Sequence, residues 1–305
     1  MSVVALPEIQ AERVPRWRAD LALAFVALVW GSTFVIVKGV LNDVSTLYFL
    51  ALRFTLASGC MLLLFLPAFR RLGWKNVARG LIGGSVTGLL LWSGYVLQTF
   101  GLKYTSAGNS GFITGFYIVL VPILSAAIYR RLPQPVELLG LSIATAGLLL
   151  LTVPGITGGR LTVNRGDVLT AGCAVAYAFH LLVLGYYSQR EAFEPVALGQ
   201  IACTALLSWT SLLMEPPSAR WHAGTIVGVV VTSVLATALA FALQTWGQKY
   251  TTATRTALLF ALEPVFAMAT AVVAGGENLT VARLAGCVLI LGGILTVELK
   301  PARTA

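Results

Sequence analysis

The sequence predicts an all-α integral membrane protein in which ten transmembrane helices form two inverted five-helix repeats. Three observations support this fold class: a composition poor in charge, ten long apolar segments, and an internal repeat. Of the 305 residues, 57% are hydrophobic and 11% are charged, and the mean hydropathy is +0.85. An average soluble domain has roughly 25% charged residues. A soluble fold could not cover its surface with so few charges.

The internal repeat is clearest in two ten-residue stretches. The letters QTFGLKYTSA at Gln98–Ala107 return as QTWGQKYTTA at Gln244–Ala253, 146 residues later. The same spacing relates two pairs of glycines, Gly140 with Gly286 and Gly147 with Gly293. Five apolar segments separate equivalent positions, and an odd number of crossings turns the second copy upside down. Inverted repeats that meet at the bilayer midplane are typical of secondary transporters.

The ten helices follow from segment length, because a helix needs roughly 20 mostly apolar residues to cross about 30 Å of hydrocarbon. The first segment, Leu21–Val37, follows several arginines as a signal peptide does. No small-residue cleavage site ends it, so we interpret it as a retained helix. In chain order, the expected helices span 20–39, 46–67, 78–100, 107–128, 137–154, 167–187, 194–214, 223–247, 254–274 and 281–298.

These segments divide the chain into an N-terminal segment (1–19), a first repeat (20–154), an extracytoplasmic linker (155–166), a second repeat (167–298) and a tail (299–305). Most of the 21 Lys and Arg residues fall in connections on the side of the N-terminus. Basic loops stay in the cytoplasm, so both termini are expected to be cytoplasmic, in the cell inner (plasma) membrane. The repeated motif then places Lys103 outside and Lys249 inside.

The net charge of +9 does not indicate a nucleic-acid partner, because the basic residues lie between apolar runs and form no single patch. The four cysteines all lie inside apolar segments, without CxxC spacing, and are interpreted as small packing residues. The expected partners are a small-molecule substrate and the lipid bilayer. We expect no cofactor and no metal, and a protein that functions as a monomer.

A substrate cavity is predicted from polar and aromatic stripes, because polar side chains in lipid are costly unless they face the bundle interior. Cys173, Tyr177 and His180 share one helix face, and the repeat pairs Trp30 with Tyr177 and Thr33 with His180. The alternative for any single aromatic is packing against lipid. The predicted substrate-binding residues are Trp30, Thr33, Trp92, Tyr95, Tyr117, Tyr177, His180 and Phe241.

Two pairs of residues are candidates for gating. Gln98 and Gln244 are equivalent by the repeat and are expected at opposite membrane faces, either as polar ends of two gates or as amides that cap helix ends. Pro122 and Pro264 pair four residues out of step with the repeat, which is about one helical turn. We therefore expect their kinks at different depths, as packing bends or as gating hinges.

Three ionisable residues lie within apolar segments. Glu263 has two possible roles: binding a coupling proton, or bonding backbone amides around a proline-bent helix. Arg53 has three: extending to the outer surface, pairing with a carbonyl, or facing a carboxylate substrate. His180 is interpreted as a neutral hydrogen-bonding residue, with titration near neutral pH as the alternative.

The motifs exclude other classes of function and point to a family. HExxH, GxSxG and GxxxxGK are absent, which argues against hydrolase chemistry and ATP-driven transport. The chain resembles the EamA-type carriers of the drug/metabolite transporter superfamily over residues 17–299. The residues that carry the resemblance are Trp30–Phe34, Tyr104–Ala107, Gly115–Pro122 and Leu262–Val265.

The resemblance implies ten helices in two inverted repeats and export of small organic solutes, commonly amino acids. The aromatic residues along the predicted cavity favour the branch that exports aromatic and neutral amino acids. Small four-helix multidrug relatives carry a proton-binding glutamate in their first helix. Here the first helix has no acid between Asp20 and Asp43, which argues against proton-coupled drug exchange by that route.

The sequence therefore predicts a secondary transporter that exports aromatic or neutral amino acids by alternating access, and not an enzyme. The first alternative is a carrier for sugar or phosphorylated metabolites. That reading ranks second because a phosphate site requires paired basic residues and Arg53 stands alone in its segment. The remote alternative is an intramembrane enzyme or receptor.

Overall fold

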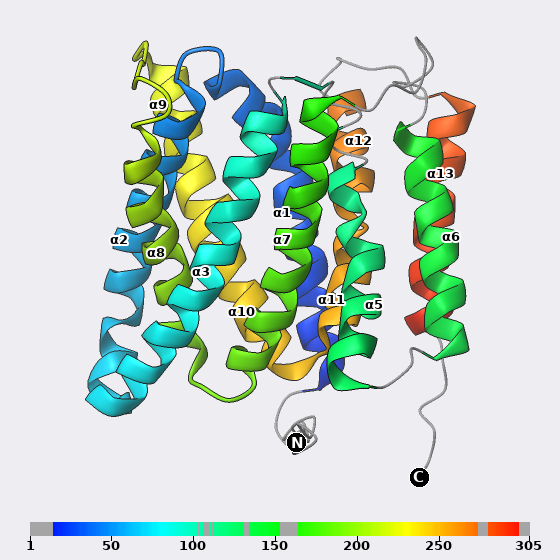
Figure 1. Cartoon of the computed structure of the whole chain (residues 1–305), viewed down its shortest axis with the longest axis horizontal. Helices are drawn as coiled ribbons and strands as arrows, with labels where there is room; N and C mark the ends of the chain where they lie inside the picture. The colour runs from blue at the N-terminus through cyan, green and yellow to red at the C-terminus, as the bar shows by residue number, and fades with distance from the viewer. Residues whose placement is uncertain are drawn as a thin grey trace.

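A computed structural model describes residues 15–102, 104–105, 110, 113–130, 134–152, 164–273 and 280–298. Lys103, the expected N-terminal segment before residue 15, residues 155–163 of the expected linker and the tail 299–305 lie outside these residues. Within the described residues, helices stand side by side in a bundle, and β structure is limited to one bridge between Val44 and Ala219 (Figure 1).

Each described helix overlaps one of the expected segments. Those of the first half are α1 (Arg16–Val40), α2 (Thr46–Leu72), α3 (Trp74–Leu102), α5 (Tyr117–Tyr129) and α6 (Pro135–Thr152). Those of the second half are α7 (Arg165–Ser188), α8 (Phe193–Ser211), α9 (Ala223–Ser233), the π-helix η2 (Val234–Leu239), α10 (Ala240–Tyr250), α11 (Ala253–Phe260), α12 (Glu263–Val273) and α13 (Val281–Glu298).

Two expected helices of the second half are interrupted. The segment 223–247 contains the π-helix η2, whose wide turn is supported by a bond from Thr237 Oγ1 to the carbonyl of Thr232, five residues earlier (2.9 Å). The segment 254–274 breaks at Ala261–Leu262. Pro264 explains that break, because its ring excludes the carbonyl four residues earlier, at Phe260, from helical bonding.

The expected kinks of Pro122 and Pro264 at different depths stay a prediction, and the structure shows an interruption of the helix in each half. In the first half, residues 113–115 are helical, Phe116 is a turn, and α5 follows. This interruption corresponds to the break at Ala261–Leu262 by the repeat spacing. Pro264 lies in the first turn of α12, where a missing N–H removes no helical bond, whereas Pro122 lies inside α5. The interruptions therefore occupy equivalent positions in the two repeats, whereas the two prolines do not.

Several helices have the length and apolarity of membrane spans. Within the described residues, five qualify: Arg16–Val37, Thr46–Leu72, Trp74–Gly101, Arg165–Ser188 and Ala223–Tyr250. Shorter apolar helices occupy Ile113–Tyr129, Pro135–Leu150 and Val281–Val297. Large apolar side chains face outward, as on Leu63 (75% exposed) and Leu206 (71%). Such an outer surface suits hydrocarbon better than water.

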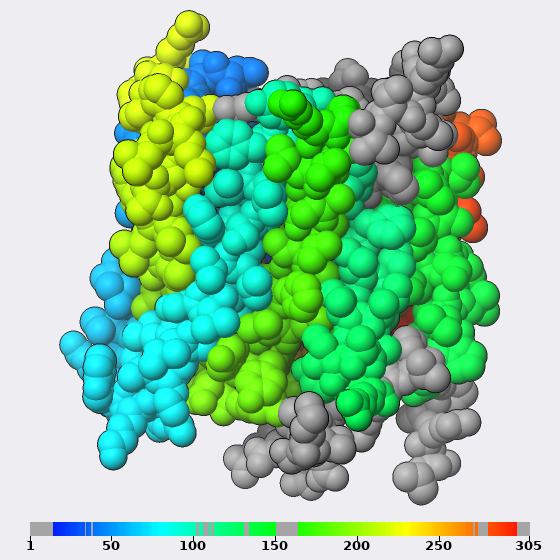
Figure 2. All heavy atoms as spheres, in the orientation of Figure 1, coloured from blue at the N-terminus to red at the C-terminus, as the bar shows by residue number. Residues whose placement is uncertain are grey.

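Helices of the two halves pack against one another. α3 contacts α7 and α8, and the corresponding α9–α10 contacts α1 and α2. α1 and α7 run in opposite directions, and the start of α1 lies at the same end of the bundle as the end of α13 (Figure 1). Seen from the front in Figure 2, α3 and α7 lie side by side.

α6 and α13 approach each other through glycines. A Cβ on Gly140 would lie 2.5 Å from the carbonyl oxygen of Gly293, and a Cβ on Gly293 would lie 2.5 Å from that of Gly140. Toward one end of the contact, a Cβ on Gly147 would lie 2.6 Å from the carbonyl oxygen of Gly286. The pairing is therefore antiparallel and reciprocal, and small residues allow this close approach of backbones.

Candidate functional site

The bundle encloses a cavity of about 230 Å³ between the two halves. It is lined by seven of the eight predicted substrate-binding residues and by three of the gating candidates. The predicted residues on its wall are Trp30, Thr33, Tyr95, Tyr117, Tyr177, His180, Phe241, Gln98, Gln244 and Glu263. The wall also contains Val37, Arg53, Leu91, Thr114, Leu181 and Phe260.

Aromatic rings form much of the wall and hold each other in edge-on contacts. Trp30 packs against Phe241 and Phe260, with ring centroids 5.2 and 5.0 Å apart. Tyr177 packs against Tyr95 at 5.8 Å, with the rings at 77°. Tilted and edge-to-face rings stabilise one another by about 0.5–1.5 kcal/mol a pair beyond their buried area. These packed rings give the cavity a largely aromatic wall.

The π-helix η2 positions two polar side chains of the first half. The carbonyl of Ala236 accepts hydrogen bonds from Trp30 Nε1 (2.8 Å) and from an NH2 nitrogen of Arg53 (3.2 Å). Arg53 Nε donates to Thr237 Oγ1 at 2.6 Å. In a π-helix the backbone bonds span five residues, and here the Ala236 carbonyl also accepts both side-chain donors. η2 therefore ties α1 and α2 to the second half at the cavity.

Arg53 is 6% exposed and does not extend to the outer surface. Of the three roles considered for Arg53, the structure shows pairing with a carbonyl, through its bond to Ala236. Within the described part of the chain it forms no ion pair, and its guanidinium lies about 6 Å from the rings of Phe49 and Phe54. The cavity wall thus contains a buried cation that forms no ion pair with a described acid.

His180 is held by a chain of buried hydrogen bonds. Its Nε2 lies 2.9 Å from Oε1 of Gln200, whose Nε2 donates to Thr245 Oγ1 (2.9 Å). Thr245 in turn donates to the carbonyl of Phe241 (2.7 Å). This order makes Nε2 of His180 the donor. The arrangement agrees with the predicted hydrogen-bonding role of His180.

Gln98 and Gln244 both line the cavity. Gln98 Nε2 donates to Thr114 Oγ1 (3.2 Å), and Gln244 Nε2 donates to Gln248 Oε1 (3.3 Å). α3 and α10 each continue for at least another turn beyond these residues, so neither amide caps a helix end. Their expected placement toward opposite membrane faces, as the polar ends of two gates, stays a prediction.

The remaining predicted residues lie as follows. Trp92 is outside the cavity wall, because its Nε1 donates to Ser211 Oγ on α8 (2.9 Å). Pro122 is buried within α5. Thr33 lines the cavity, but its hydroxyl donates a hydrogen bond to the carbonyl of Val29 in its own helix (2.7 Å). Glu263 lines the cavity beside Pro264, and among the described residues its carboxylate forms no bond to backbone amides.

Gln200 and Thr237 were missed by the sequence analysis. For Gln200 a signal exists in the expected helix 194–214, where Gln200, Thr204, Ser208 and Ser211 recur at helical spacing and are all buried. That polar stripe predicts an inward face by the same rule as the stripe on α7. Thr237 gives no such signal, because its role depends on the π-turn.

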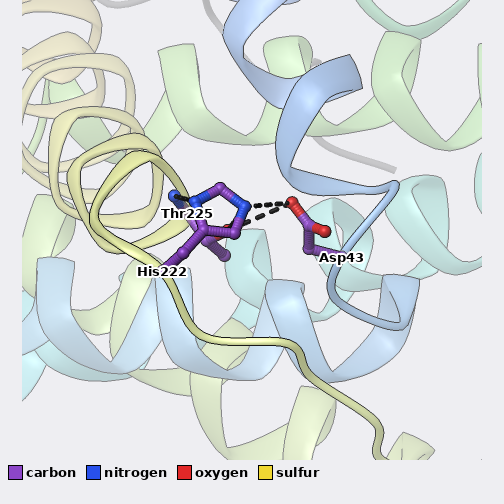
Figure 3. Close-up of polar contacts among 3 residues, drawn as sticks. All are labelled: Asp43, His222 and Thr225. Carbon is purple, nitrogen blue, oxygen red and sulfur yellow. Dashed lines mark hydrogen bonds and ion pairs between the residues drawn. The ribbon is translucent and has the colours of Figure 1, made fainter.

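Polar contacts join the first half of the chain to the second half at both ends of the bundle. At one end, His222 Nε2 contacts Asp43 Oδ2 (2.9 Å) and Thr225 Oγ1 donates to the same oxygen (3.1 Å) (Figure 3). The hydrogen bond from His222 lowers the pKa of Asp43 below its ordinary value of 3.8. At the other end, Arg255 donates to both carboxylate oxygens of Asp20, at 3.0 and 2.9 Å.

Apolar helices of membrane-spanning length around a buried polar and aromatic cavity define a membrane carrier. The comparisons agree. The EamA-like transporter family matches residues 17–153 and again residues 164–299. The chain belongs to this family, within the drug/metabolite transporter superfamily, and is a multi-pass membrane transporter.

Curated relatives match over nearly the whole chain. An uncharacterized transporter of Archaeoglobus fulgidus is 34% identical over 95% of this chain and 89% of its own length. A probable amino-acid metabolite efflux pump of Salmonella typhimurium is 28% identical over 91% of this chain and 94% of its own. A solved crystal structure has a TM-score of 0.79 at 23% identity, covering 93% of this chain and 99% of that one, which shows a common fold.

Proposed function

We propose that this protein exports small amino acids, aromatic or neutral, by alternating access across the cell inner membrane. The observation that carries the proposal is the cavity shared by both halves, with aromatic walls and few polar groups. Its volume of about 230 Å³ lies below the roughly 300–1,000 Å³ of sites for drug-sized ligands. A free amino acid suits this space. The name of the Salmonella relative supports the same class of cargo.

The proposed mechanism requires two inverted five-helix halves that rock about the cavity. Three features support this arrangement: the opposite directions of α1 and α7, the reciprocal glycine contacts of α6 and α13, and the double match of the family. We also propose that both termini are cytoplasmic and that one chain suffices for transport. The contacts Asp43–His222 and Asp20–Arg255 join the halves at opposite ends, where gates are needed.

The experiment that tests the function is efflux from proteoliposomes. Purified protein is reconstituted with radiolabelled aromatic and neutral amino acids inside, and protein-free liposomes serve as the control. We expect faster release with protein than without it, saturating with internal concentration. Equal leakage from both preparations for every amino acid in the panel would contradict the proposal.

A phosphorylated cargo is the second candidate, favoured by the buried cation at Arg53. A phosphate dianion requires more than one basic partner, and among the described residues Arg53 is the basic residue on the cavity wall. Counterflow with sugar phosphates decides between the two. Exchange of sugar phosphates faster than of amino acids would reverse their order.

A further inference from the structure

Two ionisable side chains on the cavity wall come from different halves of the chain. Arg53 belongs to α2, and Glu263 is the first residue of α12. Both line the same cavity. Within the part of the chain that the structure describes, they form no ion pair with each other or with a third residue. The cavity thus presents one cation and one carboxyl group, each facing the ligand space.

Arg53 has hydrogen-bonding capacity left for a ligand. A guanidinium has five N–H donors, and the protein uses one on Thr237 and one on Ala236. These two bonds hold the group in place and leave three N–H groups without a partner among the described residues. The guanidinium geometry matches a carboxylate, which accepts two parallel hydrogen bonds from it. A buried cation without an anion is costly, so an arriving carboxylate is strongly favoured.

Glu263 is suited to bind the positively charged ammonium group of a ligand. Among the described residues, no side chain or backbone amide donates to its carboxylate, and it follows directly on the break between α11 and α12. Tyr117 and Phe260 line the same cavity, so ring faces accompany the carboxylate. An ammonium group is attracted both by a carboxylate and by aromatic faces.

We propose that Arg53 and Glu263 are the two charged anchors of a single zwitterion site. Arg53 binds the α-carboxylate of an amino acid, Glu263 binds its α-ammonium group, and the aromatic wall receives the side chain. This inference rests on the proposed export of amino acids and adds that the cargo carries both charges. A monoamine or a monocarboxylate leaves one buried anchor unpaired and is therefore rejected. The bound zwitterion also links the two halves through its own charges.

The test compares three ligands that differ only in these charges. Phenylalanine carries both, phenethylamine lacks the carboxylate, and 3-phenylpropionate lacks the ammonium group. Binding to the purified full-length protein is measured by competition against radiolabelled phenylalanine and by direct binding of each ligand. The wild type is expected to bind phenylalanine at least about tenfold more tightly than either analogue. Leucine with its amine and acid analogues provides a second series.

Each anchor is removed in turn. Arg53→Gln is expected to abolish the preference for phenylalanine over phenethylamine, and Glu263→Gln the preference over 3-phenylpropionate. The readout is a ratio of affinities on one variant, so a smaller folded fraction does not change it. Arg53→Lys, which keeps the charge, is expected to retain part of the preference. Arg79→Gln and Glu191→Gln remove an ion pair outside the cavity wall and serve as charge-matched controls.

The outcomes separate the inference from the function on which it rests. If the wild type binds phenylalanine and leucine but Arg53→Gln and Glu263→Gln keep the wild-type ratios, the anchors are wrong and amino-acid export stands. If the wild type binds neither amino acid and releases none from proteoliposomes, both proposals fall. The zwitterion site is supported if Arg53→Gln loses only the preference over phenethylamine and Glu263→Gln loses only the preference over 3-phenylpropionate.

Discussion

Trp30 and Trp92 show how similar residues in one bundle take different roles. Each donates one hydrogen bond through its indole N–H, Trp30 to the carbonyl of Ala236 and Trp92 to Ser211 Oγ. Trp30 lies on the cavity wall and Trp92 does not. Both were predicted to bind substrate, because both stand on aromatic stripes. The helical face alone did not distinguish an aromatic that faces the cavity from one that packs against α8.

The two tryptophans therefore form a matched pair of substitutions. Trp30→Phe and Trp92→Phe each remove one hydrogen bond, worth about 0.5–1.5 kcal/mol, and we expect similar losses of thermal stability in detergent. Transport is expected to change only for Trp30→Phe, with a several-fold higher KM, because that ring also contacts cargo. Stability is measured by thermal denaturation and KM by proteoliposome efflux. Equal KM values for the two variants would contradict the placement of the cavity.

At the scale of elements, the connections α1–α2 and α8–α9 are joined by a compact polar cluster. Asp43 contacts His222 and Thr225, and the backbone of Arg220 donates to the Asp43 carbonyl at 2.8 Å. His222 also caps α9, since its Nδ1 accepts from the backbone N–H of Thr225 (3.3 Å). One side chain thus serves both a helix end and a contact between the halves.

This cluster predicts an acid-sensitive contribution to stability. The pKa of Asp43 is lower in the folded protein than its ordinary value of 3.8, chiefly because His222 donates to it. A carboxylate with a depressed pKa stabilises the fold above its unfolded pKa and loses that effect as pH falls through the folded value. The melting temperature of Asp43→Asn should therefore be lower than that of the wild type at neutral pH, and the two melting temperatures should converge below pH 3.8. A constant difference across this range would exclude the ion-dependent contact.

The contact between α6 and α13 gives a prediction with a neighbouring control. A Cβ on Gly293 would lie 2.5 Å from the carbonyl oxygen of Gly140, whereas a Cβ on Gly292 meets nothing within 4 Å. Gly293→Ala should force the helices apart and lower the melting temperature. Gly292→Ala should leave it unchanged or raise it, because alanine favours a helix by about 1 kcal/mol over glycine. Equal effects in thermal denaturation would contradict the close approach.

The elements and the cavity were largely predictable, and the reasons are local. Apolar length gives the spans, and the cost of polar groups in lipid turns the stripe containing Tyr177 and His180 inward. The π-turn was not predictable, because it is accompanied by bonds from Trp30 and Arg53, about 200 residues earlier in the chain. The same distance in sequence hid the partners of Arg53. Local periodicity cannot identify partners that only tertiary packing brings together.

At the scale of the whole molecule, equivalent connections should face opposite sides of the membrane. Asn42 follows α1 and Arg190 follows α7, and both are exposed in the structure. In a variant without the four native cysteines, Asn42→Cys should react with a membrane-impermeant maleimide on intact cells. Arg190→Cys should react only after the cells are opened. Labelling of both positions in intact cells would exclude inverted halves.

The shared carbonyl of Ala236 has a consequence for motion within the membrane. A π-turn accommodates one residue more than the α-helix around it, and each residue of an α-helix corresponds to about 100° of rotation. If η2 rewound to α geometry, α10 would turn about its axis and carry Phe241 and Gln244 away from the ligand. Because Trp30 and Arg53 both bond that oxygen, their hydrogen bonds hold η2 in its π geometry and oppose this rotation of α10.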